Sequence, residues 1–167
     1  LIDEIIFQIL SEPLTGLDLI QIRNFDNYLF MHSVNVGVIA VLIGSLMGMK
    51  RNQLQLLGLG AILHDVGKTM IKPEIMKKHG KLKPSEYESV KNHAKYGFDL
   101  LKTRTSLSFL SAHVAYQHHE REDGSGYPRG LKDDQIHVFA KITAVADTFD
   151  AMTSPRSFQE ASPPELA

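Results

Sequence analysis

The stretch LQLLGLGAILHDVGK, residues 54–68, carries two ionisable side chains at the end of an apolar helical segment. Leu54, Leu57 and Ala61 recur at helical spacing, and His64 follows on the same face, three residues after Ala61. A lone inward histidine is more often a core residue than a ligand. Here Asp65 follows at once, and burying both groups costs several kcal/mol unless they are paired or bind a metal ion. The stretch therefore predicts a buried polar site on a helical scaffold.

Outward from this stretch, the rest of the chain also has helical periodicity, with no sustained strand alternation. We expect helices over residues 2–10, 26–49, 52–67, 84–102, 106–119 and 135–153. Asp26 is the predicted N-cap of the second helix, with Gly48 near its end, and Asn52 is the predicted cap of the third. Pro84 and a Ser85/Glu88 capping box are predicted to begin the fourth. Residues 121–134 are rich in Gly and Asp and predict a loop. The predicted fold class is all-α: a compact multi-helix bundle with a metal site at its centre.

Composition excludes several classes of function. The 167 residues carry 18 Lys plus Arg against 19 Asp plus Glu, so no broad basic face for DNA or RNA is expected. The chain has no Cys, which excludes disulfides, thiolate metal sites and Cys nucleophiles, and it has eight His. The most apolar stretch, Val34 to Met49, would span ~24 Å as a helix, short of a bilayer core. We interpret it as a buried helix without membrane contact.

Further His and Asp residues are predicted on the inward faces or inner ends of helices: His32, His93, His118, His119 and Asp147. Each alone would be read as a core residue. With His64 and Asp65 they form a set of seven on five successive helices, the way carboxylate–imidazole metal sites are built in helical bundles. Mixed His/Asp ligation suits Fe, Mn, Ni or Zn, and the number of ligands favours two metal ions over one. His79, His113 and His137 are expected in structural or solvent-exposed roles.

In order along the chain, these residues resemble the pattern of the HD superfamily of metal-dependent phosphohydrolases. Residues 118–128, HHEREDGSGYP, are similar to the HHExxDGxGYP signature of its HD-GYP branch, and residues 64–68 match its HDxGK motif. The resemblance covers residues 20–160. It divides the chain into a helical lead-in (residues 1–18), an HD-GYP catalytic domain (residues 19–160) and a tail or linker (residues 161–167).

The resemblance implies a phosphodiesterase that hydrolyses the bacterial second messenger cyclic di-GMP to pGpG, and in some members on to GMP. It implies two divalent transition metals, most often Fe or Mn. By similarity, one ion is held by His32, His64, Asp65 and Asp147, and the other by His93, His118 and His119, with Asp65 bridging. Asp65 and Lys68 are the implied catalytic residues, and Lys68, Gly126, Tyr127 and Arg156 the implied substrate contacts, while Asp123 is expected to structure its loop. A cytoplasmic domain of a larger regulatory protein is implied, with docking of GGDEF-domain proteins through the Gly-Tyr-Pro loop.

Three departures from the family pattern shape these expectations. Tyr28 stands where trinuclear members have a Glu ligand, which favours a dinuclear site. The stretch after the last helix reads RSFQ, residues 156–159, instead of Arg-Pro-Tyr-Arg/Lys, so one basic phosphate contact is missing at Gln159 and weaker substrate binding is expected. The chain stops at Ala167, where relatives continue into further helices.

Three alternative functions differ in the residues that they need. A P-loop is excluded because Ile62 stands where the motif needs Gly. A general HD nucleotidase or (p)ppGpp hydrolase would share His32, His64, Asp65 and Asp147 but does not need His118 and His119 or the Gly-Tyr-Pro loop. A catalytically weak cyclic di-GMP sensor or docking module remains open as the alternative from another class.

Overall fold

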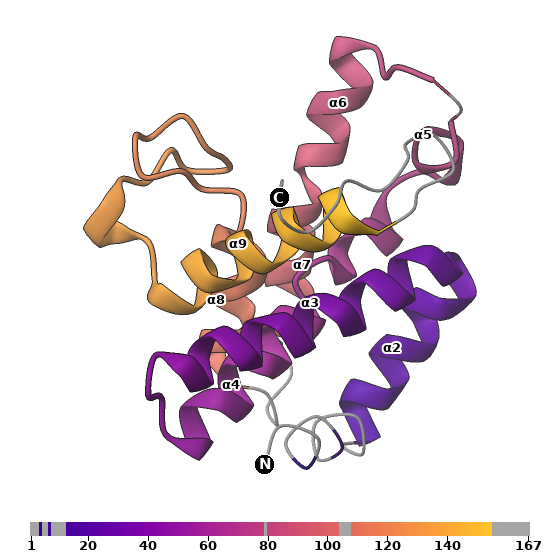
Figure 1. Ribbon diagram of the computed structural model, residues 1–167. Helices are drawn as coiled ribbons and strands as arrows, with labels where there is room; N and C mark the ends of the chain where they lie inside the picture. The colour runs from indigo at the N-terminus through magenta and orange to yellow at the C-terminus, as the bar shows by residue number, and fades with distance from the viewer. Residues whose placement is uncertain (1–3, 5–6, 8–12, 79, 104–107, 155–167) are drawn as a thin grey trace.

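The computed structural model describes residues 4, 7, 13–78, 80–103 and 108–154, and their regular elements are helices (Figure 1). In chain order these are α2 (Pro13–Phe25), α3 (Asn27–Leu46), α4 (Arg51–Ile62), the 3₁₀ helix η1 (Val66–Met70), α5 (Pro73–Met76), α6 (Pro84–Lys91), α7 (His93–Leu101), α8 (Phe109–Gln117), the 3₁₀ helix η2 (Asp133–Gln135) and α9 (Val138–Thr153). One isolated β-bridge joins Asp123 to Lys132. The predicted all-α fold class is confirmed.

Helix α3 is the central helix of the bundle and packs against α2, α4 and α9. Its N-cap is Asp26, as predicted: the carboxylate accepts hydrogen bonds from Tyr28 N (2.7 Å) and Leu29 N (3.3 Å). It ends at Leu46, just before Gly48, whose φ of +76° suits glycine. By length and composition alone α3 is long and apolar enough to cross a membrane, but 44% of its most apolar window is buried against the bundle.

Small residues let the helices touch. A Cβ added to Gly37 of α3 would lie 2.3 Å from Ile62 Cγ1 of α4, and one on Gly60 of α4 would lie 2.8 Å from Val114 Cγ2 of α8. Two packed clusters result, one centred on Ile22, Leu54 and Leu63 and the other on Val36, Leu57 and Phe139. The polar site lies between the elements that these clusters hold in place.

Several predicted boundaries were wrong. Helix α2 was not expected; it begins at Pro13, a residue type that is favoured in the first turn of a helix. Helix α4 begins at Arg51 with Gln53 Oε1 accepting from Lys50 N (2.9 Å), so Asn52 is not its cap. The segment predicted as one helix over residues 52–67 divides into α4 and η1.

The predicted helix over residues 84–102 divides in the same way, at Asn92, into α6 and α7. Its capping contact comes from Glu86, whose Oε2 accepts from Lys83 N (2.6 Å), and not from the Ser85/Glu88 pair. The two C-terminal helices begin later than predicted, with Ser108 and His137 as the N-caps of α8 and α9. The predicted helix over 2–10 and the tail over 161–167 fall wholly or largely outside the described residues, and the expected domain boundary at 18/19 falls within α2.

Candidate metal centre

The structure brings all seven predicted ligand residues together in two adjacent groups. One group contains Asp65, His93, His118 and His119, and the other contains His32, His64 and Asp147. Within each group, one potential ligand atom per residue lies within 4.8 Å of every other. The side chains come from five places in the fold: α3, the turn between α4 and η1, the start of α7, the end of α8 and the middle of α9.

The turn that carries His64 and Asp65 reaches the start of α7 because of a glycine. A Cβ on Gly67 would lie 2.0 Å from His93 O and 2.4 Å from Gly97 N, so only glycine fits there. The backbone of η1 therefore lies directly on α7. This close approach brings Asp65 Oδ1 to 3.3 Å from His93 Nε2.

Asp65 lies between the two groups and presents a different oxygen to each. Its Oδ1 faces His93 Nε2 (3.3 Å) and His118 Nε2 (3.8 Å), and its Oδ2 faces His64 Nε2 (3.3 Å). Lys68 Nζ pairs with the same Oδ2 at 2.5 Å. Burial tends to raise the pKa of Asp65, but Lys68 and His64 outweigh it and hold the pKa well below the usual value. The carboxylate is therefore ionised, although it is 1% exposed.

Main-chain carbonyls determine which nitrogen of three histidines is free. The Nδ1 atoms of His64, His93 and His118 lie 2.7, 2.7 and 3.0 Å from the carbonyl oxygens of Ala61, Val90 and Ala115, respectively. A carbonyl can only accept, so each Nδ1 carries a proton, and in a neutral ring the Nε2 atom is then the nitrogen with the lone pair. Burial lowers the pKa of His93 to about 4 and that of His118 well below its usual value, so both rings are neutral.

The part of the site around His93 and His118 fits a metal centre because electron-pair donors face one another there without a proton between them. His93 Nε2 and His118 Nε2 are 3.4 Å apart, and His64 Nε2 and Asp65 Oδ1 are buried without a hydrogen-bond partner in the described part of the chain. Buried polar atoms of this kind are unfavourable unless a cation lies among them. Imidazole and carboxylate together suit a divalent transition metal.

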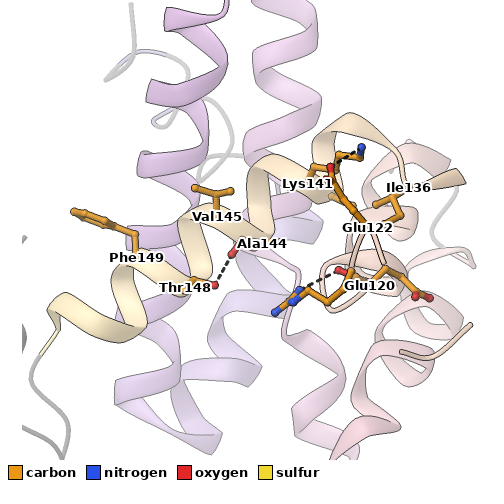
Figure 2. A pocket seen from close by; sticks show the side chains of 10 residues that line it. Glu120, Glu122, Ile136, Lys141, Ala144, Val145, Thr148 and Phe149 are labelled. Carbon is orange, nitrogen blue, oxygen red and sulfur yellow. Dashed lines mark hydrogen bonds and ion pairs between the residues drawn. The ribbon is translucent and has the colours of Figure 1, made fainter. Parts of the chain in front are cut away.

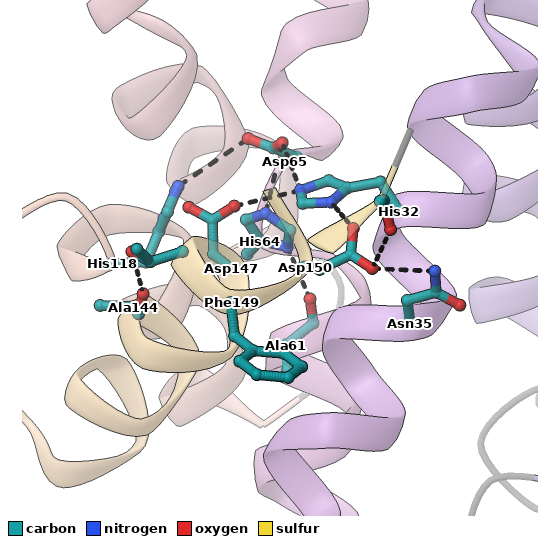
Figure 3. A network of polar contacts seen from close by, with 12 residues as sticks. His32, Asn35, Ala61, His64, Asp65, His118, Ala144, Asp147, Phe149 and Asp150 are labelled. Atoms are coloured by element: carbon teal, nitrogen blue, oxygen red, sulfur yellow. Dashed lines mark hydrogen bonds and ion pairs between the residues drawn. The ribbon is translucent and has the colours of Figure 1, made fainter. Parts of the chain in front are cut away.

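His32 is oriented by a carboxylate that the sequence analysis missed (Figure 3). Its Nδ1 lies 2.6 Å from Asp150 Oδ2 and its Nε2 lies 3.1 Å from Asp147 Oδ1. Asp150 in turn accepts from Asn35 Nδ2 (2.9 Å) and Ser154 Oγ (2.8 Å). Burial opposes protonation of His32, but the bonds to Asp147 and Asp150 raise its pKa to about 9. Spacing could have identified Asp150, because it lies one helical turn after Asp147 and therefore on the same face of α9.

The Gly-Tyr-Pro loop lies against the second group of ligands. The Tyr127 ring stacks on His119 with centroids 4.7 Å apart, and Tyr127 N donates to His119 O (3.2 Å). A Cβ on Gly126 would lie 2.4 Å from Arg121 N and from Glu120 Cα, so the loop can pack this closely only with glycine. Burial raises the pKa of Tyr127, which therefore stays a neutral phenol. Gly126 and Tyr127 thus lie beside the ligand group, while Arg156 is outside the described residues.

A second missed residue, Glu120, holds this loop in place. It is 3% exposed, and its two carboxylate oxygens accept from Arg129 N (2.8 Å) and Leu131 N (2.8 Å). Asp123, in contrast, is exposed and accepts from Ser125 N and Ser125 Oγ within the loop. The signal for Glu120 was its position directly after His118 and His119 in the motif.

The remaining candidates lie around the centre or away from it. Tyr28 stacks parallel to His32, with ring centroids 6.2 Å apart. His113 packs edge-on against Phe109, and His137 caps α9; neither belongs to the two ligand groups. His79 is outside the described residues.

A cavity of about 510 Å³ lies between the loop and the outer face of α9 (Figure 2). Its walls include Glu120, Arg121, Lys141 and Val145. None of the seven predicted ligand residues lines it, so it is separate from the metal centre.

Comparison with known proteins identifies the family. Residues 20–167 match the HD domain family. The chain belongs to this HD domain family. Over 87% of its length it superimposes on 75% of the HD domain of the Listeria monocytogenes phosphodiesterase PgpH in complex with cyclic-di-AMP, with a TM-score of 0.66 and 21% identity. The HD fold predicted from the motifs is therefore confirmed.

Curated relatives extend the comparison to the HD-GYP branch. A cyclic di-GMP phosphodiesterase of Pseudomonas aeruginosa is 36% identical over 160 residues, which cover 96% of this chain and 39% of the relative. A 3'3'-cGAMP-specific phosphodiesterase of Vibrio cholerae is 35% identical over 77% of this chain and 25% of the relative. The resemblance to the HD-GYP branch is confirmed, and the chain spans well under half the length of these relatives.

Proposed function

We propose that this HD domain is a metal-dependent phosphodiesterase that hydrolyses cyclic di-GMP to pGpG or GMP in bacterial second-messenger signalling. One observation carries the proposal: Asp65 directs one oxygen to each of two adjacent groups of imidazole and carboxylate side chains. The similarity to a cyclic di-GMP phosphodiesterase over 96% of the chain supports this substrate class.

We assign His32, His64, Asp65 and Asp147 to one metal ion and His93, His118 and His119 to a second, with Asp65 shared. When bound, two divalent cations polarise a phosphodiester and lower the pKa of water, so that a nucleophile forms at neutral pH. Imidazole and carboxylate donors suit Fe, Mn, Ni or Zn, and Fe or Mn is proposed from the resemblance to HD-GYP domains. With Tyr28 stacked on His32 in place of a carboxylate ligand, two ions are proposed and not three.

Lys68 supplies the one lysine charge paired with the shared carboxylate among the described residues. Its side chain is 21% exposed, so it lies at the edge of the centre, where a phosphate oxygen can approach. As a compact point charge it would stabilise the negative charge that grows on the phosphate in the transition state. Gly126 and Tyr127 would form the neighbouring wall of the substrate site, with Arg156 as a further phosphate contact.

The test is metal content per chain, measured on anaerobically purified protein beside hydrolysis of cyclic di-GMP and 3'3'-cGAMP with added Mn²⁺ or Fe²⁺. Two ions per chain with turnover of cyclic di-GMP are expected. Asp65→Asn should abolish hydrolysis and lower metal content together. Lys68→Gln should lower kcat about 100-fold with metal content retained. Absence of metal under every loading condition contradicts the mechanism, and preferential turnover of 3'3'-cGAMP contradicts the substrate.

The second candidate is a cyclic di-GMP sensor or a docking module for GGDEF-domain proteins in the cytoplasm. It is favoured by the position of the Gly-Tyr-Pro loop, in which Pro128 is exposed at the surface beside the metal centre. Two bound metals with nucleotide binding but no turnover would select this function. If the chain binds GGDEF domains and a substitution of Pro128 abolishes this binding, the chain also has the docking role.

A further inference from the structure

Helix α6 contributes no buried residue to the core. Figure 1 shows it projecting from the body of the bundle, above α7. Its side chains on the exposed side include Tyr87, which is 49% exposed. Because hydrophobic burial does not explain the position of this helix, its contacts with the neighbouring site become informative.

One side chain of α6, Lys91, reaches Tyr127 of the Gly-Tyr-Pro loop and also lies over the Tyr87 ring of its own helix. Tyr87 and Lys91 are one helical turn apart and share a face. Lys91 Nζ lies 5.0 Å from the centroid of the Tyr87 ring and 5.6 Å from that of the Tyr127 ring. Tyr127 stacks on His119, one of the predicted metal ligands. The ammonium group of Lys91 and the rings of Tyr87 and Tyr127 therefore form a row that begins beside the proposed metal centre and ends at the surface.

The ion pair between Lys91 and Glu88 leaves the Lys91 ammonium group available to bind a ligand. Glu88 Oε1 accepts from Lys91 Nζ at 2.8 Å, but the Glu88 side chain is 68% exposed. Exposed pairs of this kind contribute little to stability and exchange readily. An ammonium group is suited to a phosphate, and an aromatic face is suited to stacking on a nucleobase.

A cyclic dinucleotide has two phosphodiesters and two bases, and only one phosphodiester can react at the metal centre at a time. The other phosphate carries a negative charge outside the centre and needs a cation there. Resting on the proposed function, we propose that Lys91, Tyr87 and Tyr127 form the site for the second half of the substrate. Lys91 pairs with the second phosphate, and Tyr87 stacks on the adjoining purine.

The experiment compares steady-state hydrolysis of cyclic di-GMP and of bis(p-nitrophenyl) phosphate, which has no second phosphate and no purine, by the metal-loaded chain. Lys91→Gln should raise KM for cyclic di-GMP about tenfold, the effect of losing one charge-assisted contact, with little change in kcat. Tyr87→Ala should raise it by about the same factor. Glu88→Gln should lower it about twofold, because it removes a competing carboxylate.

Lys102→Gln is the matched control. Lys102 also pairs with a carboxylate three residues earlier, Asp99 (2.5 Å), and also lies over an aromatic ring, Phe98 (5.2 Å), but it lies beyond the far end of α7 from His93. The inference is supported if Lys91→Gln and Tyr87→Ala raise KM more for cyclic di-GMP than for bis(p-nitrophenyl) phosphate. It is overturned if Lys91→Gln behaves like Lys102→Gln while the parent chain hydrolyses cyclic di-GMP. If the parent chain hydrolyses bis(p-nitrophenyl) phosphate but not cyclic di-GMP, the proposed function itself is wrong.

Discussion

Single residues determine which atoms of the centre are free to bind a metal. Ala61, Val90 and Ala115 each accept from the Nδ1 of a histidine, which leaves the Nε2 atoms for the ion. His32 differs because its Nδ1 is held by the carboxylate of Asp150. A carboxylate makes an imidazole ring a stronger donor than a carbonyl does, so of the proposed ligands His32 should depend most on its partner.

Asp150→Asn tests this dependence. The amide keeps the size of the side chain but removes the charge that orients His32, so affinity for Mn²⁺ should fall by about 10- to 100-fold while the fold is retained. Competition against a chelating dye measures the affinity, and circular dichroism checks the fold. Asp99→Asn, which removes an exposed carboxylate in a surface pair, is the control and should leave affinity unchanged. Equal affinity in both variants would show that Asp150 does not position His32.

The convergence of the seven candidate ligand residues could be predicted from the sequence, because each combined an inward helical position with a place in the motif pattern. Asp150 and Glu120 were missed because an isolated carboxylate on a helix or in a polar loop is usually solvated. Their roles depend on partners distant in the sequence: His32 for Asp150, and the backbone of Arg129 and Leu131 for Glu120. Spacing along the chain does not record such contacts.

At the scale of elements, the contact between η1 and α7 brings the two ligand groups together. Gly67→Ala would place a methyl group against the backbone of His93. We expect a loss of at least ~3 kcal/mol in the free energy of unfolding and a weaker metal site, because backbone cannot move aside as a side chain can. Chemical denaturation and metal titration measure the two effects.

Gly48→Ala is the matched control for this substitution. Gly48 has a φ of +76° and open space around its Cβ position, so alanine there should cost only ~1–2 kcal/mol of backbone strain. Metal affinity should not change, since Gly48 is in the loop after α3. If the two alanine variants lost equal stability, the close approach at Gly67 would not be a constraint.

Element boundaries were predicted less well than element types. Pro13 and Asn92 illustrate the reason, since each is compatible with both the end of one helix and the start of the next. Tertiary contacts decided between these alternatives: η1 turns away from the axis of α4 where Gly67 meets α7. Local propensity carries no information about that contact.

For the whole molecule, the centre joins helices that are distant in the sequence, so removal of the metal should lower the stability of the whole domain. An ion that binds only the folded chain stabilises it by ~2.7 kcal/mol at a concentration 100 times its Kd. For a domain of this size, chelation should therefore lower Tm by about 5–10 °C. Differential scanning calorimetry with and without EDTA measures the shift. Asp65→Asn should show a much smaller response to EDTA, and an equal response would mean that the stabilising ion binds elsewhere.

The whole-molecule prediction from sequence was correct in class and in the location of its polar centre. Seven inward residues on five helices could satisfy one another only if the helices converged, which left few arrangements. The lengths and angles of the helices, the exposed position of α6 and the cavity beside α9 did not follow, because they depend on packing between side chains that the sequence does not pair.

The order of the ligands along the chain has a consequence for when a metal can be acquired. The first ligand, His32, lies in the first long helix of the bundle, and the last, Asp147, lies in the final described helix. During synthesis, the group that contains both cannot assemble until α9 has left the ribosome and docked. If the centre binds metal as proposed, this group therefore selects its ion only after α9 has packed against α3. Because protein sites of this type do not rank metals by affinity alone, the ion incorporated will reflect the metal pool around the finished chain.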